Sequence, residues 1–471
     1  MTWWTTRRKG EESGEKGTMM SDLIEQALAS ADDTDRVVMG DGVLAATGPM
    51  FRELFGQARG VIIADENTWA AAGEQVSASL KDAGVELAEP YVFPGSPSVY
   101  AKYENVELLR EFLAPLDANA VVVGSGTLND LVKRASDELG RRYLVVCTAA
   151  SMDGYAAFGA SLSVDGFKTT LTCRAPQGLV VDLPTLAAAP QRCTATGVGD
   201  LIEKIPAGAD WILADELGIE PIDQGSWDLA QGRLEAAISD PQGLVDREPG
   251  AFVALAEGLV LSGLSMQRYR ISSRPASGAG HLFSHVWEME HLGMDEDPPL
   301  THGFKVGLGT LATLALWQNA VDLDVTAIDT EEVVARWRSR EDTEAFVRSW
   351  FTGNMVEPAI KQTLDKYLTA DELRGRIELI KDRWPTITER ARAQIIPPER
   401  AEAILKQVGA YWHPQQIGLS RQRFKDTYLR CRMIRSRYTL PDALFELGVL
   451  DEQVDRLFAP DGFWGRRPWA E

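Results

Sequence analysis

Histidine residues give the first sign of chemistry in this chain, because they are few and gathered in one stretch. The sequence holds five histidines, and His281, His285, His291 and His302 all fall in the segment that starts at SSRPASGAGH and ends at THGFKVGLGT. Imidazole is the commonest metal ligand in proteins and a frequent proton shuttle near neutral pH. The clustering therefore predicts a functional centre and is hard to explain by packing alone.

The spacing of these histidines suggests how a metal ion could be held. His281 and His285 are four residues apart, so on a helix they lie on one face. Both could bind one ion, or one could bind it while the other meets a substrate; the alternative is a pair of hydrogen-bonded helix histidines. Asp200, in GVGDLIEK, is a candidate carboxylate ligand, and otherwise it would only cap the helix that we expect to start there. One carboxylate and two imidazoles would leave coordination positions open, as a catalytic metal requires.

Two glycine motifs compete for a dinucleotide. Gly40 to Ala45 fits the G-x-G-x-x-A pattern, and Asp65 follows at the distance where a carboxylate would meet the ribose. The second motif, GSGTLND from Gly124, follows a stronger strand and opens a better helix, but it lacks the third glycine. Either loop could hold a pyrophosphate on its backbone amides, and either could be a plain tight turn. Asp65 would favour NAD over NADP, because a 2′-phosphate would meet its charge; its alternative role is a helix N-cap.

The segment TAASMDG follows a third strand. In open parallel sheets, ligands bind beyond the carboxyl ends of the strands. The hydroxyl groups of Thr148 and Ser151 and the carboxylate of Asp153 suit a polar ligand there. An ordinary turn is an equally good interpretation of this short stretch.

The elements that must position these groups differ between the two halves of the chain. From residue 22 to residue 190, short apolar runs such as VIIAD, AVVVGSG, YLVVCT, TTLTC and LVVDL alternate with amphipathic segments, which is typical of a parallel sheet with helices on both faces. After residue 191 helical spacing dominates, and Leu229 to Ile238 is one such helical segment. We predict an α/β plus all-α fold: an N-terminal Rossmann-like parallel-sheet domain over 22–190, followed by a C-terminal all-helical metal-binding domain over 191–471. Residues 1–21 are predicted to be a disordered extension.

Composition excludes several classes of protein. The chain of 471 residues is 45% hydrophobic and 25% charged, and its net charge is −21. Such an acidic chain is a poor ligand for nucleic acid, whose binding depends on Lys and Arg. The four cysteines form no C-x-x-C pair, so a reduced cytoplasmic protein is expected. We predict no membrane span, since the most apolar segment, Val306 to Val321, suits a buried helix better.

Taken together, these motifs resemble the sn-glycerol-1-phosphate dehydrogenase family, within the iron-containing alcohol dehydrogenase and dehydroquinate synthase-like superfamily. The resemblance runs from Asp22 to near Phe458. It is carried by GSGTLND, TAASMDG, GFKTT, VVDLPTL, GVGDLIEK, SRPASG with H-x-x-x-H, HG…VGLGT and RSRYTLPDALFELGVL. The string SRPASG with the two spaced histidines and the later HG is the most specific part.

The resemblance implies a role for each candidate residue. NAD or NADP would rest its pyrophosphate on the second glycine loop, so the Gly40 motif would be a decoy. The residues lining the cofactor would be Gly124, Ser125, Gly126, Thr127, Leu128, Thr148, Ala149, Ala150 and Ser151. One divalent ion, zinc, nickel or iron, would be held by Asp200, His281 and His302. Asp153 and His285 would face the substrate, with Asp200 close enough to touch it.

The implied reaction is reversible hydride transfer between NAD(P)H and C2 of dihydroxyacetone phosphate, which gives sn-glycerol 1-phosphate. The metal would act as a Lewis acid and His285 as a proton relay. Four cations near the motifs are candidates for the substrate phosphate, or else interface ion pairs: Lys204, Arg268, Arg274 and Lys305. We expect a homo-oligomer, a dimer or larger.

Three departures from the family pattern keep other interpretations open. Cys147 stands where proline is usual, Ala157 where a serine contacts the cofactor, and Gly280 where a glutamate precedes the first metal histidine. The loss at Gly280 could weaken the support of the metal site. The alternatives are a dehydrogenase for an unphosphorylated polyol such as glycerol, a carbocycle-forming enzyme of the dehydroquinate synthase type, and a degenerate, non-catalytic ligand-binding relative.

Overall fold

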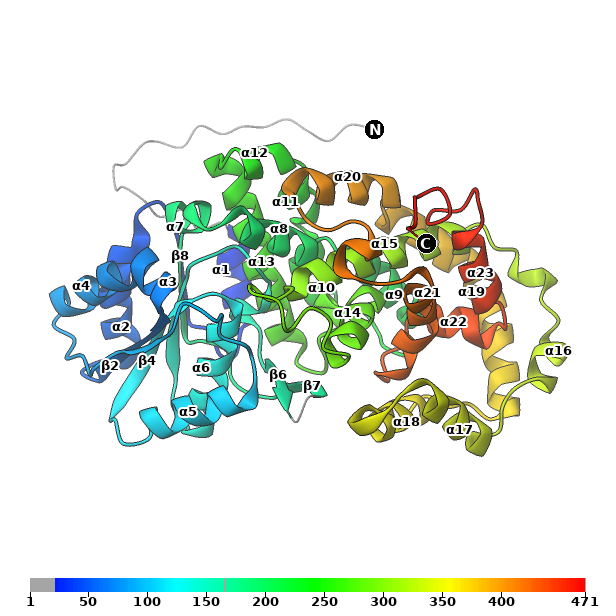
Figure 1. Ribbon diagram of the computed structural model, residues 1–471, viewed down its shortest axis with the longest axis horizontal. Coiled ribbons are helices and arrows are strands. Elements are labelled where there is room, and N and C mark those ends of the chain that lie inside the picture. Colours follow the sequence, from blue (N-terminus) through cyan, green and yellow to red (C-terminus); the bar gives the residue numbers. More distant parts are fainter. Residues whose placement is uncertain (1–21, 165–166, 471) are drawn as a thin grey trace.

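A six-stranded parallel sheet forms the N-terminal half of the computed structural model, which describes residues 22–164 and 167–470. The extension predicted over 1–21 lies outside the described residues. The strand order is β1-β8-β5-β4-β2-β3 (Figure 1). The strands are β1 (Arg36–Gly40), β2 (Arg59–Asp65), β3 (Tyr91–Phe93), β4 (Ala118–Gly124), β5 (Tyr143–Cys147) and β8 (Gly178–Asp182). The sheet confirms the predicted Rossmann-like arrangement.

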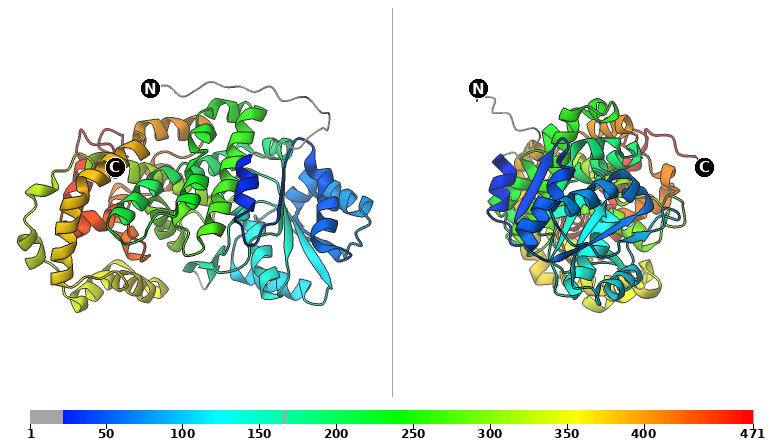
Figure 2. Two further views of the ribbon diagram at one scale, coloured as in Figure 1. Left: turned by 180° about the vertical axis from the view of Figure 1, so that it is seen from behind. Right: turned by 90° about the vertical axis from the view of Figure 1, so that its left-hand side faces the viewer.

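Helices cover both faces of this sheet, because its strands are apolar on both sides. Successive side chains of a strand point to opposite faces, so Ile62 and Ala64 pack in one core cluster, and Val61 and Ile63 pack in the other. The first face is covered by α2 (Thr47–Phe55) and α4 (Glu74–Asp82). The second is covered by α5 (Tyr103–Leu113) and α6 (Gly126–Glu138) and continues into the core of the helical half. Figure 2 shows this layering from behind and end-on.

One predicted strand lies outside the parallel sheet. The TTLTC run enters β7 (Phe167–Leu171), which pairs antiparallel with β6 (Ala160–Val164) in a separate two-stranded sheet. The prediction of a strand was correct, but this strand does not join the parallel sheet through a crossover helix. Its antiparallel partner is only a few residues away, so the two segments form a hairpin.

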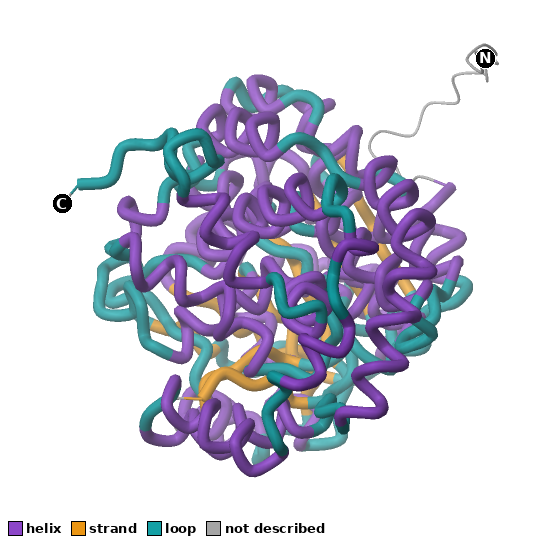
Figure 3. Tube along the Cα trace, turned by 90° about the vertical axis from the view of Figure 1, so that its right-hand side faces the viewer, coloured by secondary structure: helices purple, strands orange, loops and turns teal. Residues whose placement is uncertain are grey.

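The helical half follows directly. Among the described residues, no strand comes after Asp182. When the molecule is viewed from the end formed by the helical half, helices lie in front of most of the strands (Figure 3). The helices are α7 (Leu183–Ala188), α8 (Gln191–Leu201), α9 (Lys204–Glu216), α10 (Gln224–Gln231), α11 (Leu234–Ile238), α12 (Pro241–Val245), α13 (Pro249–Tyr269), α14 (Ala279–Met289), α15 (His302–Ala320), α16 (Thr330–Ala335), α17 (Arg340–Trp350), α18 (Val356–Leu364), α19 (Ala370–Gln394), α20 (Pro398–Val408), α21 (Arg421–Arg430), α22 (Leu440–Glu446) and α23 (Leu450–Phe458). The single helical segment predicted over Leu229 to Ile238 is two helices, since α10 ends before Gly232.

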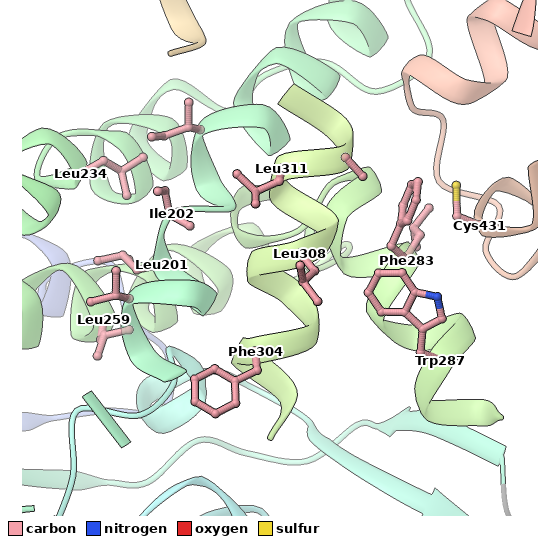
Figure 4. Packing of buried hydrophobic residues seen from close by; sticks show 14 of the residues in the cluster. Leu201, Ile202, Leu234, Leu259, Phe283, Trp287, Phe304, Leu308, Leu311 and Cys431 are labelled. Atoms are coloured by element: carbon pink, nitrogen blue, oxygen red, sulfur yellow. The ribbon is translucent and has the colours of Figure 1, made fainter. Parts of the chain in front are cut away.

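The centre of the helical half is built around α15. Leu308 and Leu311 of α15 lie between Leu201 on one side and Phe283 and Trp287 of α14 on the other (Figure 4). Of the described helices, α13 alone has the length and apolar composition to cross a membrane, rather than the predicted Val306 to Val321 segment. Of its most apolar stretch, 78% is buried inside the fold, as in the core helix of a globular protein.

Glycine allows α8, α14 and α15 to approach one another at backbone distance. A Cβ atom at Gly199 of α8 would lie 2.4 Å from the carbonyl oxygen of Gly303 in α15. A Cβ atom at Gly309 of α15 would lie 2.1 Å from the carbonyl oxygen of Gly280 in α14. Both distances are too short for any side chain. These contacts fix the three helices that carry the candidate metal ligands.

The Gly309→Ala variant tests this packing. Its methyl group must push two helix backbones apart, so the free energy of unfolding should fall by about 1–3 kcal/mol. Gly375→Ala in α19 is the matched control, because nothing lies within 4 Å of its new methyl group; it should raise that free energy by about 0.4–1 kcal/mol. Chemical denaturation of both variants measures the difference. Equal effects would contradict the packing argument.

Candidate metal centre and cofactor loop

Three side chains from three helices converge on one point. Asp200 lies in the last turn of α8, His281 in the first turn of α14, and His302 begins α15. One candidate ligand atom from each lies within 4.8 Å of the others. The prediction that Asp200 lies in the first turn of a helix was wrong, because α8 already starts at Gln191. Asp200 therefore caps no helix start, and its carboxylate points into the cluster.

Both histidines have a carboxylate behind them. Glu203 Oε2 lies 2.8 Å from His281 Nδ1, and Glu288 Oε1 lies 2.7 Å from His302 Nδ1. Carboxylates that accept from one ring nitrogen orient the other nitrogen toward a metal and fix its tautomer. Sequence reasoning missed both residues, because neither spacing nor composition marks a partner that packing supplies.

The donor set fits a divalent cation. Asp200 Oδ1 is buried without a hydrogen-bond partner and lies 3.3 Å from His281 Nε2. A buried carboxylate oxygen without a hydrogen-bond partner is costly, and an ion held by Asp200, His281 and His302 would satisfy it. One carboxylate and two imidazoles are ligands that zinc, nickel and ferrous iron all accept.

Lys204 is the buried cation of the centre. Its Nζ lies 2.7 Å from Asp153 Oδ2 and 3.6 Å from Asp200 Oδ1. Burial opposes its charge, but Asp153 and Asp200 raise its pKa to about 12. Burial alone would raise the pKa of Asp200, yet Lys204 and His281 hold that pKa well below its usual range. Lys204 was a candidate for the substrate phosphate; the structure corrects this, since the ammonium is fully buried and already engaged by carboxylates.

His285 lies beside the cluster and outside its ligand set. Its ring centroid is 6.3 Å from that of His281 and 5.9 Å from that of His302. Its Nδ1 lies 3.6 Å from Glu288 Oε2, too far for a good hydrogen bond. Burial, with a contribution from Arg435, lowers the pKa of His285 to about 3, so the imidazole is neutral at physiological pH.

The second glycine loop leads into a helix whose first turn has no side-chain cap. Ser125 is the N-cap residue of α6, and its side chain makes no capping hydrogen bond. A Cβ atom at Gly126 would lie 2.7 Å from Cγ of Met152, so glycine is needed for the loop to pack there. Thr148 N donates to Gly124 O at 3.1 Å, which sets the TAASMDG segment beside this loop.

A carboxylate of the protein itself binds a backbone amide of the first glycine motif. Val43 N, which follows a turn at Gly42, donates to Asp182 Oδ1 at 2.7 Å. That amide is thus already hydrogen-bonded within the protein, which agrees with the expectation that the Gly40 motif does not hold the pyrophosphate. Asp65 ends β2 and caps α3 (Glu66–Thr68), where its Oδ1 accepts from Thr68 N at 2.8 Å. The capping role predicted as the alternative for Asp65 is therefore present.

The loop after β5 joins the two candidate sites. Asp153 N donates to Asp200 Oδ2 at 3.0 Å, and Ser262 Oγ donates to Asp153 Oδ2 at 2.8 Å. A Cβ atom at Gly197 of α8 would lie 2.0 Å from Ala150 O. The residues predicted to line the cofactor therefore pack directly on the helix that carries Asp200.

Two further phosphate candidates are corrected. Arg268 Nε pairs with Asp223 at 2.8 Å, and the fully buried Arg274 pairs with Glu220 at 3.1 Å. Both cations are thus engaged in ion pairs, as in the alternative, but these pairs lie within the helical half and not at the interface between the two domains. Lys305 is 2% exposed and lies one helical turn after the ligand His302, so it stays close to the centre.

Arg435 is a cation that sequence reasoning left without a role, although it belongs to the quoted RSRY segment. Burial lowers its pKa, and Glu288 opposes that shift. Its Nη1 donates to Ile434 O at 3.1 Å. Among the described residues, no carboxylate oxygen lies within 4.0 Å of its guanidinium. Arg435 therefore makes no ion pair among the described residues, and its charge acts on Glu288 and His285.

The three departures from the family pattern lie at buried positions. Ala157 is buried with Met266 and Ala276 in a small apolar cluster, and Cys147 lies in the main core. The four cysteines are free. Although position 280 is a glycine and not the usual glutamate, His281 still has a carboxylate neighbour, because Glu203 supplies one.

Comparison with known proteins decides the family. The sequence pattern of the iron-containing alcohol dehydrogenases matches residues 38–190. A glycerol-1-phosphate dehydrogenase [NAD(P)+] of Methanosarcina barkeri is 33% identical over 289 residues, which are 60% of this chain and 77% of that protein. The chain belongs to the glycerol-1-phosphate dehydrogenase family. This family is part of the iron-containing alcohol dehydrogenases, and the sequence motifs predicted both memberships.

Other relatives carry the same name. That of Halalkalibacterium halodurans is 33% identical over 55% of this chain, and that of Bacillus subtilis 34% identical over 52%. The matched regions span 64% and 62% of those two proteins. Among solved structures, a probable glycerol dehydrogenase from Sinorhizobium meliloti aligns with a TM-score of 0.57 at 16% identity and covers 90% of this chain and 98% of its own. A maleylacetate reductase from Agrobacterium tumefaciens aligns with a TM-score of 0.56 at 14% identity, covering 90% and 96%. At these identities the structures establish the two-part fold.

Metal analysis of two histidine variants tests the centre. His302→Ala removes one of three candidate ligands, so the zinc bound per chain after dialysis should fall from about one to near zero, because two remaining ligands hold an ion poorly. His291→Ala is the matched control, since His291 is exposed and lies outside the cluster. It should keep the wild-type metal content. Equal metal in the two variants would remove His302 from the site.

Proposed function

We propose that this chain is a metal-dependent oxidoreductase that interconverts dihydroxyacetone phosphate and sn-glycerol 1-phosphate with NAD or NADP. The observation that carries the proposal is the contact between two sites: the Asp200, His281 and His302 cluster adjoins the loop that leads to the glycine-bordered start of α6. Relatives named glycerol-1-phosphate dehydrogenase [NAD(P)+] support the choice of substrate.

Residues of the sheet half would bind and orient the nucleotide. The free amides at the start of α6, from Gly126 to Leu128, suit a pyrophosphate, since a helix N-terminus attracts anions. The stretch from Thr148 to Ser151 would line the nicotinamide side, and Asp65 would meet the ribose. When bound, the nicotinamide would exchange a hydride with C2 and the ion held by Asp200, His281 and His302 would act as a Lewis acid on the C2 oxygen.

His285 would move the proton. Oxidation of the alcohol releases hydride from C2 and a proton from the C2 oxygen, and reduction takes both back. The imidazole of His285, whose ring centroid lies 6.3 Å from that of the candidate ligand His281, would relay that proton to solvent. Asp153, fixed by Lys204 and by Ser262, would hold a substrate hydroxyl in place.

Arg435 would recognise the substrate phosphate. In a chain of net charge −21, a phosphate needs a local cation that is not already neutralised. Arg435 meets this need beside His285, whereas Arg268 and Arg274 do not. A guanidinium also matches the geometry of phosphate oxygens.

The decisive assay is NADH consumption with dihydroxyacetone phosphate, with and without a chelator, followed by stereochemical analysis of the product. We expect turnover that the chelator abolishes and added zinc, nickel or ferrous iron restores, and a product that is sn-glycerol 1-phosphate. Preference for glycerol would defeat the proposal in favour of a polyol dehydrogenase. A sugar phosphate converted without net NADH would indicate carbocycle formation, and absence of both metal and turnover a non-catalytic ligand-binding protein.

Arg435→Leu tests phosphate recognition. Loss of a charge-assisted hydrogen bond of about 1.5–3 kcal/mol should raise KM for dihydroxyacetone phosphate by about 10-fold to 100-fold. Activity with unphosphorylated dihydroxyacetone should stay unchanged, because that substrate lacks the group. Arg268→Leu is the control and should change neither value. Equal losses with both substrates would assign Arg435 a structural role.

We also propose a cytoplasmic enzyme that acts as a homo-oligomer on a small phosphorylated substrate. Light scattering after size exclusion measures the assembly, and a monomer at all concentrations would contradict it.

A further inference from the structure

We propose that Glu203 is a positioning residue of the metal site and that Gly280 is what admits it to His281. The inference rests on the proposed metal centre and not on the identity of the substrate. It concerns a carboxylate that lies between α8 and α9, behind a ligand contributed by α14.

Glu203 holds both the ring and the backbone of the segment that carries His281. Its side chain is fully buried, and Oε2 lies 2.8 Å from Nδ1 of the imidazole. Oε1 accepts from Gly278 N at 3.0 Å and from His281 N at 3.4 Å. One carboxylate thus caps the start of α14 and turns the Nε2 atom of its histidine toward Asp200.

Glycine at position 280 makes the room. A Cβ atom there would lie 2.8 Å from Cγ of Glu203 and 3.1 Å from its Oε1. It would also lie 3.0 Å from Thr310 N. The neighbours on both sides are fixed, since Glu203 is fully buried and Thr310 N belongs to α15. A side chain at 280 and the present position of Glu203 therefore exclude each other.

The arrangement at the second histidine supports this role. Glu288 accepts from His302 Nδ1 at 2.7 Å, which matches the pair made by Glu203 and His281. Each imidazole thus has one nitrogen fixed by a buried carboxylate and the other turned to the cluster. Removing such a partner typically lowers metal affinity by about 10-fold to 100-fold.

Glu203→Gln tests the charge while keeping the shape. Glutamine can still accept from Gly278 N, so the fold should survive, whereas its pairing with Nδ1 loses the negative charge. We expect the Kd for Zn²⁺, measured by competition with a chelator in the full chain, to rise by about 10-fold to 100-fold. Glu402→Gln is the control: this buried carboxylate pairs with Arg467 and Lys406, outside the centre, and its substitution should leave the Kd unchanged. An unchanged Kd for Glu203→Gln would overturn the proposal.

A swap of the two positions tests the exclusion. Gly280→Glu alone should weaken Zn²⁺ binding and lower the Tm, because two side chains compete for one space. In Glu203→Ala/Gly280→Glu the space is free, and a carboxylate from position 280 can enter it; the one remaining close contact is with Thr310 N. We expect the double variant to bind Zn²⁺ at least tenfold more tightly than Glu203→Ala, and the visible spectrum of its Co²⁺ form to approach that of the wild type. A double variant that binds no better than Glu203→Ala would overturn the exclusion.

The titrations separate this inference from the proposed function. They need neither nucleotide nor substrate, so a failure to turn over dihydroxyacetone phosphate leaves them unaffected. A wild-type chain that takes up no Zn²⁺ would overturn the metal centre and this inference together. A wild type that binds while every variant binds equally well would overturn only the role of Glu203.

Discussion

The backbone contact of α14 with α15 and of α15 with α8 is the constraint on which the centre depends. Helices with ordinary side chains at their crossing point stay 8–10 Å apart, and here Gly280, Gly309, Gly199 and Gly303 bring carbonyl oxygens to within reach of the opposing Cα atoms. This close approach of the helices goes with the convergence of the Asp200, His281 and His302 side chains on one point. Packing in the apolar centre of the helical half then serves to hold the distance.

Charge is the second constraint. Around the cluster the fold buries the carboxylates of Asp153, Asp200, Glu203 and Glu288, and the fully buried Lys204 pairs with two of them. His285 stays neutral because burial lowers its pKa. Carboxylates gathered this closely in a low-dielectric interior repel one another and need cations among them. A divalent ion held by Asp200, His281 and His302 would add positive charge among these carboxylates, which agrees with a donor set that suits a metal.

Much of the architecture could be predicted from the sequence, because it depends on local patterns. Apolar runs bounded by turns located the strands of the parallel sheet, and the spacing of histidines located the centre. What failed depends on contacts between distant segments. The helix that carries Asp200 begins earlier than its glycines suggested, and TTLTC pairs with a hairpin neighbour instead of the main sheet. Glu203, Glu288 and Arg435 have no signature of their own, since packing alone brings them to the histidines.

The three candidate ligands all come from helices that follow the sheet in the chain, while the glycine loop proposed for the nucleotide belongs to the sheet half. During biosynthesis the centre is complete only once α15 has emerged, well after the nucleotide-binding half has been made. The candidate ion site of a newly made chain would therefore be completed only after the sheet half has left the ribosome.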